Sequence, residues 1–161
     1  MSRVIYSLYI DIPEDDLDFF DKNIIKKDQT PTNINTKNKF SKHYQKIVDN
    51  KKRYSDSIGV DYYLHENDEN FKHYVKYFKT HFPFITMYNI VNFYKLELMN
   101  NHLHDYDEAL YLDFDAIPVT KDNFFETWDL SKGIAVYNNN DNIRPTHMPL
   151  DMVKGTIRSP S

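Results

Sequence analysis

ALYLDFDAIPVT, residues 109–120, is the stretch of this chain that decides the fold. An apolar run ends there in two aspartates one residue apart, and Pro118 follows them. Such a run, bounded by polar stretches, predicts a buried strand with Asp113 and Asp115 at its carboxyl end. Because a strand alternates its faces, both carboxylates point the same way if the extended conformation continues through Phe114.

The rest of the chain alternates segments typical of strands with segments typical of helices. Strands are expected at 3–12, 59–68, 108–115 and 133–138, helices at 39–57, 71–79 and 84–101, and a helical turn at 121–128. Residues 21–38 are polar and contain Pro31, which predicts a loop. This order predicts an α/β fold with a mostly parallel, Rossmann-like sheet flanked by helices. We expect that domain over residues 1–138 and an irregular segment at 139–161.

Composition limits the classes of protein to which the chain can belong. The 161 residues are 40% hydrophobic and 16% aromatic, enough for a folded core. The absence of cysteine excludes disulfides, thiolate metal sites and a cysteine nucleophile. A net charge of −4, with acids near most of the basic residues, argues against nucleic acid as a partner. The first apolar run is too short for a signal peptide or a transmembrane segment, so we expect a cytoplasmic protein.

The two aspartates stand where an α/β sheet binds its ligands, outside the carboxyl ends of the strands. Paired carboxylate oxygens suit Mg²⁺ or Mn²⁺, and a divalent ion removes the repulsion between them. Such ions commonly bind a substrate phosphate as well. Asp113 and Asp115 are therefore candidate metal ligands for a nucleoside diphosphate, although aspartates before Pro118 are also typical of an ordinary turn.

Lys95 is the second candidate functional residue. Helical spacing over residues 84–101 places it near Val91, Leu98 and Met99, on the apolar side of the predicted helix. Burying an unpaired ammonium group is costly, so Lys95 either extends to solvent or pairs with an anion. An aspartate of the next strand or a bound phosphate would supply that anion. The histidines His102 and His104 are expected on a polar helix end rather than on a metal.

Residues 93–139, FYKLELMNNHLHDYDEALYLDFDAIPVTKDNFFETWDLSKGIAVYNN, resemble the central block of family 8 glycosyltransferases, a group that includes glycogenin and bacterial lipopolysaccharide galactosyltransferases. The shared pattern is a helix carrying K-L, an apolar strand ending in D-x-D, and a following aspartate-rich segment. The resemblance implies the nucleotide-binding half of the type A glycosyltransferase fold. It also implies a hexosyltransferase-like enzyme that uses a nucleotide sugar, with a UDP-sugar as the expected donor.

The same resemblance implies a role for each candidate residue. Asp113 and Asp115 would hold Mn²⁺ or Mg²⁺ against the diphosphate, and the backbone of Phe114 would contact the ribose. Lys95 would be the catalytic residue that faces the phosphate or the transferred sugar. At the end of the first strand, Ser7 and Tyr9 would border the nucleotide base, with core packing as the alternative role for Tyr9.

The chain departs from the family after the D-x-D motif. Family members continue with an acceptor-binding half and a late histidine that completes the metal site, whereas His147 stands in a context, RPTHMP, that does not match. We therefore expect a donor-binding part, whose acceptor is an unknown glycan, protein or lipid. Such a part would work with a complementing C-terminal half or as a homo-oligomer, because an isolated half leaves apolar surface uncovered.

Two other functions remain open from the sequence. LYLDFDAIPVT also resembles the first motif of haloacid dehalogenase-like phosphatases, in which the first acid is the nucleophile and Mg²⁺ binds nearby. Ile117 stands where that motif has Thr or Val. The third alternative is a non-catalytic nucleotide-sugar-binding or structural α/β domain.

Overall fold

The computed structural model describes residues 1–12, 14–22, 31–127 and 133, with the side chains of 14 and 31–39 left out. The chain divides into two compact units, Met1–Lys121 and Asp122–Ser161. In the second unit, the helical turn expected at 121–128 is observed as α5 (Phe124–Thr127). Apart from Gly133, the strand expected at 133–138 lies outside the described residues, as does the segment 139–161.

The first unit is built on a three-stranded sheet in which all strands are parallel, in the order β2-β1-β3. β1 (Arg3–Leu8) lies in the centre, β2 (Asp61–His65) on one side and β3 (Glu108–Tyr111) on the other. Val4 to Leu8 are all buried, as expected of a central parallel strand covered on both faces. The predicted α/β class with a parallel sheet is confirmed.

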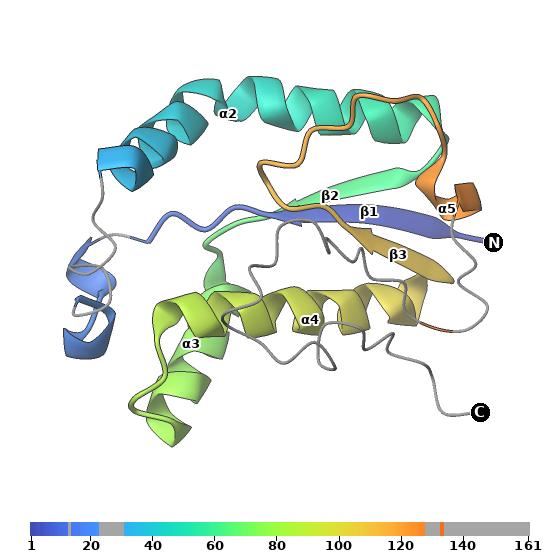
Figure 1. Ribbon diagram of the computed structural model, residues 1–161. Coiled ribbons are helices and arrows are strands. Elements are labelled where there is room, and N and C mark those ends of the chain that lie inside the picture. The colour runs from blue at the N-terminus through green and yellow to red at the C-terminus, as the bar shows by residue number, and fades with distance from the viewer. Residues whose placement is uncertain (13, 23–30, 128–132, 134–161) are drawn as a thin grey trace, which may run out of the picture. The chain divides into compact units, whose positions relative to one another are not determined.

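Helices cover both faces of this sheet. α2 (Pro31–Ser57) connects β1 to β2, while α3 (Glu69–His81) and α4 (Met87–Asp105) connect β2 to β3. Figure 1 shows α2 over one face and α3 and α4 over the other. The two connections cross the sheet in opposite directions, so right-handed crossovers place their helices on opposite faces. Sheets of this strand order bind ligands where the directions diverge, between the carboxyl ends of β1 and β3.

The loop predicted at 21–38 is wrong at both ends, because residues 19–22 form a helical turn and α2 begins at Pro31. Residues 23–30 lie outside the described part of the chain. Proline is tolerated in the first turn of a helix, where its missing N–H would have no helical partner. The other end of α2 was correctly predicted from Gly59. Gly59 has a φ of 67°, and the amides of Val60 and Gly59 donate to the carbonyls of Ser55 (3.0 Å) and Asp56 (3.3 Å). These two bonds form a Schellman motif, which stops the helix.

α4 begins at Met87 rather than at the expected residue 84. Thr86 is its N-cap, and its side chain accepts a hydrogen bond from the amide of Asn89. The residues before it form a turn, in which the amide of Ile85 donates to the carbonyl of Phe82 at 2.9 Å. The helix then continues past the expected end at residue 101 to Asp105, since no helix breaker intervenes.

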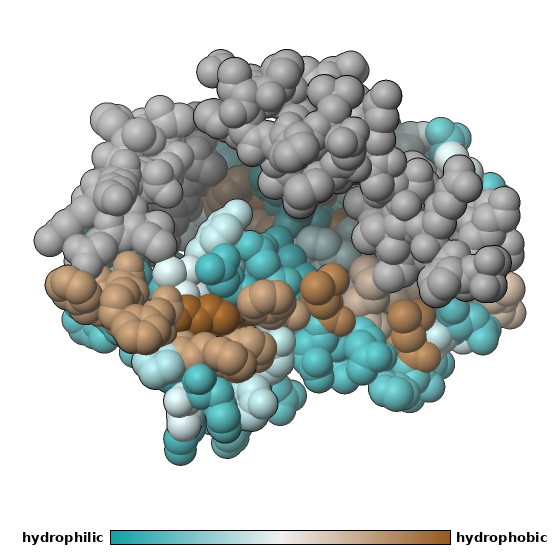
Figure 2. Space-filling model, turned by 60° about the horizontal axis from the view of Figure 1, so that its bottom comes forward, coloured by the Kyte–Doolittle hydropathy of each residue, from teal (hydrophilic) through white to brown (hydrophobic). Residues whose placement is uncertain are grey.

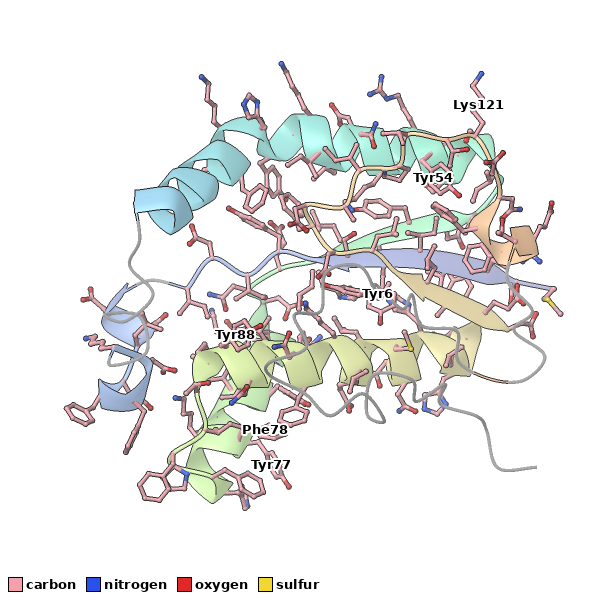
Figure 3. The ribbon with its side chains drawn as sticks, in the orientation of Figure 1. Tyr6, Tyr54, Tyr77, Phe78, Tyr88 and Lys121 are labelled. Carbon is pink, nitrogen blue, oxygen red and sulfur yellow. The ribbon has the colours of Figure 1, made fainter. Side chains whose placement is uncertain are left out.

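A hydrophobic core fills the space between the sheet and the α3–α4 layer. It contains Tyr6, Leu8, Phe71, Met87, Ile90, Tyr94 and Leu98. Tyr6 extends from β1 to α4 (Figure 3), where its hydroxyl donates to the carbonyl of Lys95 at 2.8 Å. This contact fixes α4, and with it Lys95, against the central strand.

The outer face of α3, α4 and their connection is partly apolar. Figure 2 shows hydrophobic side chains gathered there, among them the exposed residues Phe82, Phe84, Phe93 and Leu96. None of the helices in the described part of the chain is long and apolar enough to cross a membrane.

Candidate functional site

The D-x-D motif lies in a turn just beyond β3. The strand ends at Tyr111, and the amide of Ala116 donates to the carbonyl of Asp113 at 2.9 Å, which closes a turn over residues 113–116. The expectation that the strand continues through Phe114 is therefore wrong, since residues 114 and 115 belong to this turn. The side chains of Asp113 and Asp115 are nevertheless both exposed, while Phe114 between them is buried.

Phe114 is buried because it belongs to an aromatic cluster on the α2 side of the sheet. Its ring centroid lies 4.5 Å from that of Tyr9, 5.5 Å from that of Tyr44 and 6.3 Å from that of Phe40. Tyr9 follows β1, whereas Tyr44 and Phe40 belong to α2. Packing of Phe114 in this aromatic cluster directs the carboxylates on either side of it toward solvent.

Lys95 and Asp113 form an ion pair at the carboxyl edge of the sheet. Lys95 Nζ lies 2.9 Å from Asp113 Oδ1, and the hydroxyl of Tyr111 donates to the same oxygen at 2.6 Å. Partial burial tends to raise the pKa of Asp113, but the hydrogen bonds from Tyr111 and Lys95 and the nearby positive charges outweigh it. The pKa of Asp113 is therefore held below its ordinary value, which keeps this carboxylate ionised.

The expected surroundings of Lys95 need one correction. The buried residues of α4 are Met87, Ile90, Tyr94 and Leu98, so Lys95 lies at the edge of the apolar face and not within it. Its side chain is 26% exposed, and that of Asp113 is 58% exposed. Lys95 Nζ also lies 5.1 Å from the ring centroid of Tyr111. The anion that a half-buried lysine needs is thus an aspartate of the D-x-D motif itself.

Lys51 of α2 is a functional candidate that was not predicted from the sequence. It is fully buried, and its Nζ donates to the backbone carbonyls of Asp113 at 2.7 Å and Ala116 at 2.6 Å. Burial lowers the pKa of Lys51 to about 8, against the opposing effect of the negative charges on Asp115 and Asp113. The helical spacing in the sequence could have indicated its burial, because Lys51 lies between Ile47 and Tyr54 on the buried face of α2.

Ser7 and Tyr9 differ in what they can offer a ligand. Ser7 is fully buried, and its hydroxyl donates to the carbonyl of Leu112 at 2.8 Å, which ties β1 to the segment after β3. This conformation presents no surface of Ser7 to a nucleotide base. Tyr9 is half-buried beside Phe114 and keeps part of its ring at the surface. The base contacts implied by the resemblance stay predictions.

A metal at this site would have two carboxylates from the chain. The described residues contain no group of three or more His, Cys, Asp or Glu side chains placed to hold a metal ion. Mg²⁺ and Mn²⁺ are often bound through one or two carboxylates plus phosphate and water, so Asp113 and Asp115 fit such an ion. Since Lys95 and Tyr111 both contact Oδ1 of Asp113, the ion would take the other oxygen or displace Lys95.

His102 and His104 lie in the last turn of α4, at the helix end where both were expected, but His102 is half-buried and makes contacts of its own. Its Nε2 lies 2.9 Å from Nε2 of His65, and its ring centroid lies 4.9 Å from that of Tyr6. The two histidines border a cavity of about 600 Å³ whose lining also includes Tyr94 and Glu97. This cavity is formed by β2, α3 and α4, so it lies apart from the turn that carries the D-x-D motif.

By its fold, the first unit belongs to the α/β class and has a three-stranded parallel sheet. No match to this chain was found among protein families, curated proteins or solved structures. The case for a function therefore rests on the residues at the carboxyl edge of the sheet.

Proposed function

We propose that this chain is the donor-binding part of a type A glycosyltransferase and binds a nucleoside diphosphate sugar between the carboxyl ends of β1 and β3. The observation that carries the proposal is the ion pair of Lys95 with Asp113, beside the exposed Asp115. Two carboxylates and one ammonium group at this edge match the charges of a metal–diphosphate complex. The carboxylates would hold Mn²⁺ or Mg²⁺, and Lys95 would contact a phosphate oxygen.

Both partners of the ion pair are accessible to such a ligand. An exposed lysine–carboxylate pair contributes little to stability. Replacing the lysine by a metal ion, or the carboxylate by a phosphate, therefore costs little free energy. Asp113 and Asp115 would hold the ion, and Lys95, beside Asp113, would be placed to pair with the diphosphate. When bound, the ion would offset negative charge on the departing diphosphate, and Lys95 would add a fixed positive charge at the same place.

Nucleotide titration tests the donor site directly. We expect UDP to bind the purified chain in a calorimeter when Mn²⁺ is present and to bind much more weakly without it. GDP tests the choice of base, and a phosphate monoester tests the rival phosphatase. Absence of binding by both nucleotides would contradict the proposal, and steady hydrolysis of the monoester would replace it by the phosphatase.

Substitution of the carboxylates tests which groups hold the metal. Asp113→Asn and Asp115→Asn should each weaken Mn²⁺-dependent UDP binding by ~10-fold or more, as expected for loss of a charged ligand. The matched control is Asp56→Asn on α2, which removes an exposed negative charge at the far end of a helix. Equal affinity in all three variants would exclude this metal site.

Lys95→Met tests the phosphate contact separately from the metal. We expect roughly 10-fold weaker binding of the Mn²⁺–UDP complex, as for loss of one charge-assisted hydrogen bond, with helix packing unchanged. Lys76→Met, which removes an exposed ammonium group from α3, is the control for a general change of charge. If both variants bind like the wild type, Lys95 has no role in donor binding.

A further inference from the structure

We infer that Lys51 is the positioning residue of the D-x-D turn: its ammonium group holds the backbone from beneath so that both carboxylates face the ligand. This inference rests on the proposed function for its ligand, but its structural part can be tested without one. Lys51 and Lys95 act on the same turn from α2 and α4, which cover opposite faces of the sheet.

The contacts of Lys51 are of an unusual kind for a buried lysine. Its Nζ donates to two backbone carbonyls, those of Asp113 and Ala116, rather than to a carboxylate. These carbonyls begin and end the turn, so one ammonium group fixes both of its ends. Figure 1 shows the segment after β3 passing back along α2, the helix that carries Lys51.

A neutral side chain could fill this space at lower cost, because burying an ammonium group without a carboxylate partner is unfavourable. The two acids of the motif explain why a positive charge is present at this buried position. Asp113 and Asp115 are the charges that act on Lys51. Lys51 reduces the repulsion between them before a metal binds. It stays in place when the metal and the diphosphate arrive, since its bonds are to the backbone.

Lys51 thus differs from Lys95 in its expected behaviour on binding. Lys95 contacts the exposed carboxylate of Asp113 and would exchange partners when a ligand binds. Lys51 donates its hydrogen bonds to backbone carbonyls of the turn and would keep these partners. One lysine belongs to the binding surface, and the other keeps the loop that carries this surface in shape.

The first test replaces Lys51 by Met and measures two quantities. Amide hydrogen exchange of Ala116, whose N–H closes the turn, should become ~10-fold faster or more as local opening becomes easier. Mn²⁺-dependent UDP affinity should fall by ~10-fold or more. Lys52→Met, at the exposed neighbouring position on α2, should change neither.

A second variant separates the ammonium group from the packing of its chain. The sequence contains no cysteine, so Lys51→Cys can be alkylated at a single site in denaturant and then refolded, with the wild type taken through the same steps as a control. Aminoethylation restores an ammonium group at nearly the original length, whereas propylation restores the length without the charge. We expect the aminoethyl form alone to recover slow Ala116 exchange and UDP affinity.

The results distinguish failure of this inference from failure of the proposed function. If the wild type binds neither UDP nor GDP in the presence of Mn²⁺, the donor site is refuted, and Ala116 exchange still decides whether Lys51 holds the turn. If Lys51→Met leaves exchange and affinity unchanged, or the propyl form recovers both, the inference is overturned. Should none of the variants fold, the Lys51 ammonium resonance of the wild type provides the test: bound Mn²⁺ should broaden it, and an unaffected resonance overturns the inference.

Discussion

Asp21 should be a far stronger determinant of stability than its place in a polar stretch suggests. Its carboxylate is almost fully buried, and it accepts hydrogen bonds from Lys79 Nζ at 2.8 Å and from the amide of Met87. Lys79 also contacts Asp18 at 2.6 Å and the carbonyl of Ile85 at 2.8 Å. The Asp21 carboxylate therefore joins the helical turn at residues 19–22 to α3 and to the start of α4.

The structure allows the cost of Asp21→Asn to be worked out. Removing one partner of a buried ion pair typically costs about 3–5 kcal/mol, because the remaining charge is left uncompensated. Lys79 keeps Asp18 and a carbonyl in this variant, and an amide oxygen can still accept the bond from Met87. We therefore expect a loss of about 2–3 kcal/mol, at or just below the lower limit of that range.

Asp18→Asn is the matched comparison, since it removes the other carboxylate from the same lysine. The Asp18 side chain is 37% exposed, against 2% for Asp21. An exposed ion pair contributes about 0–1 kcal/mol to stability. The side-chain oxygen of asparagine can also still accept the N-cap hydrogen bonds that Asp18 accepts from the amides of Phe20 and Asp21. Urea denaturation followed by circular dichroism measures both variants. Equal destabilisation by the two substitutions would refute the reasoning from burial.

Three further predictions concern other parts of the first unit. Burial lowers the pKa of His65 and His102, and the charge on His102 lowers that of His65 further. As the pH falls, these histidines therefore take up protons in the unfolded chain before they do so in the folded chain. The free energy of unfolding should therefore fall as the pH drops below about 6.5. His102→Gln should reduce this slope in urea titrations relative to the wild type; an unchanged slope would contradict the assignment. Gly59→Ala should cost about 1 kcal/mol in the same assay, from left-handed backbone strain alone, because no heavy atom beyond the adjacent residues lies within 4 Å of the added carbon. Phe114→Ala should cost about 3–5 kcal/mol by emptying a buried aromatic position; a loss under about 1 kcal/mol would mean that the aromatic cluster does not hold the turn.

The strands were predictable because their signals are local. β1 carries an apolar and aromatic run interrupted by Ser7, and β3 is followed by the acidic pair that marks the carboxyl edge of a sheet. The start of α2 was not predictable in the same way. Its first residues are polar and include Pro31 and several asparagines, a composition that fits a loop as well as an exposed helical turn.

Part of the candidate site could be predicted as well. Helix periodicity indicated that Lys95 needs an anion or access to solvent, and an aspartate of the next strand was one of the anions expected; the structure supplies Asp113. Ser7 could not be placed, since its position near the end of β1 does not tell which neighbour takes its hydroxyl. Lys51 was missed because its partner Asp113 lies 62 residues away, and the polar sequence around it hid the buried face to which it belongs.

Different residues hold the main chain and the Asp113 side chain of the D-x-D turn. A binding loop requires such an arrangement. Lys51 and the buried ring of Phe114 hold the main chain from the α2 side, whereas Lys95 and Tyr111 contact the Asp113 carboxylate from the other side. A ligand that displaces Lys95 therefore leaves the contacts of the main chain intact. Because the loop need not reorganise, the free energy of forming its shape is supplied by folding and not by the ligand.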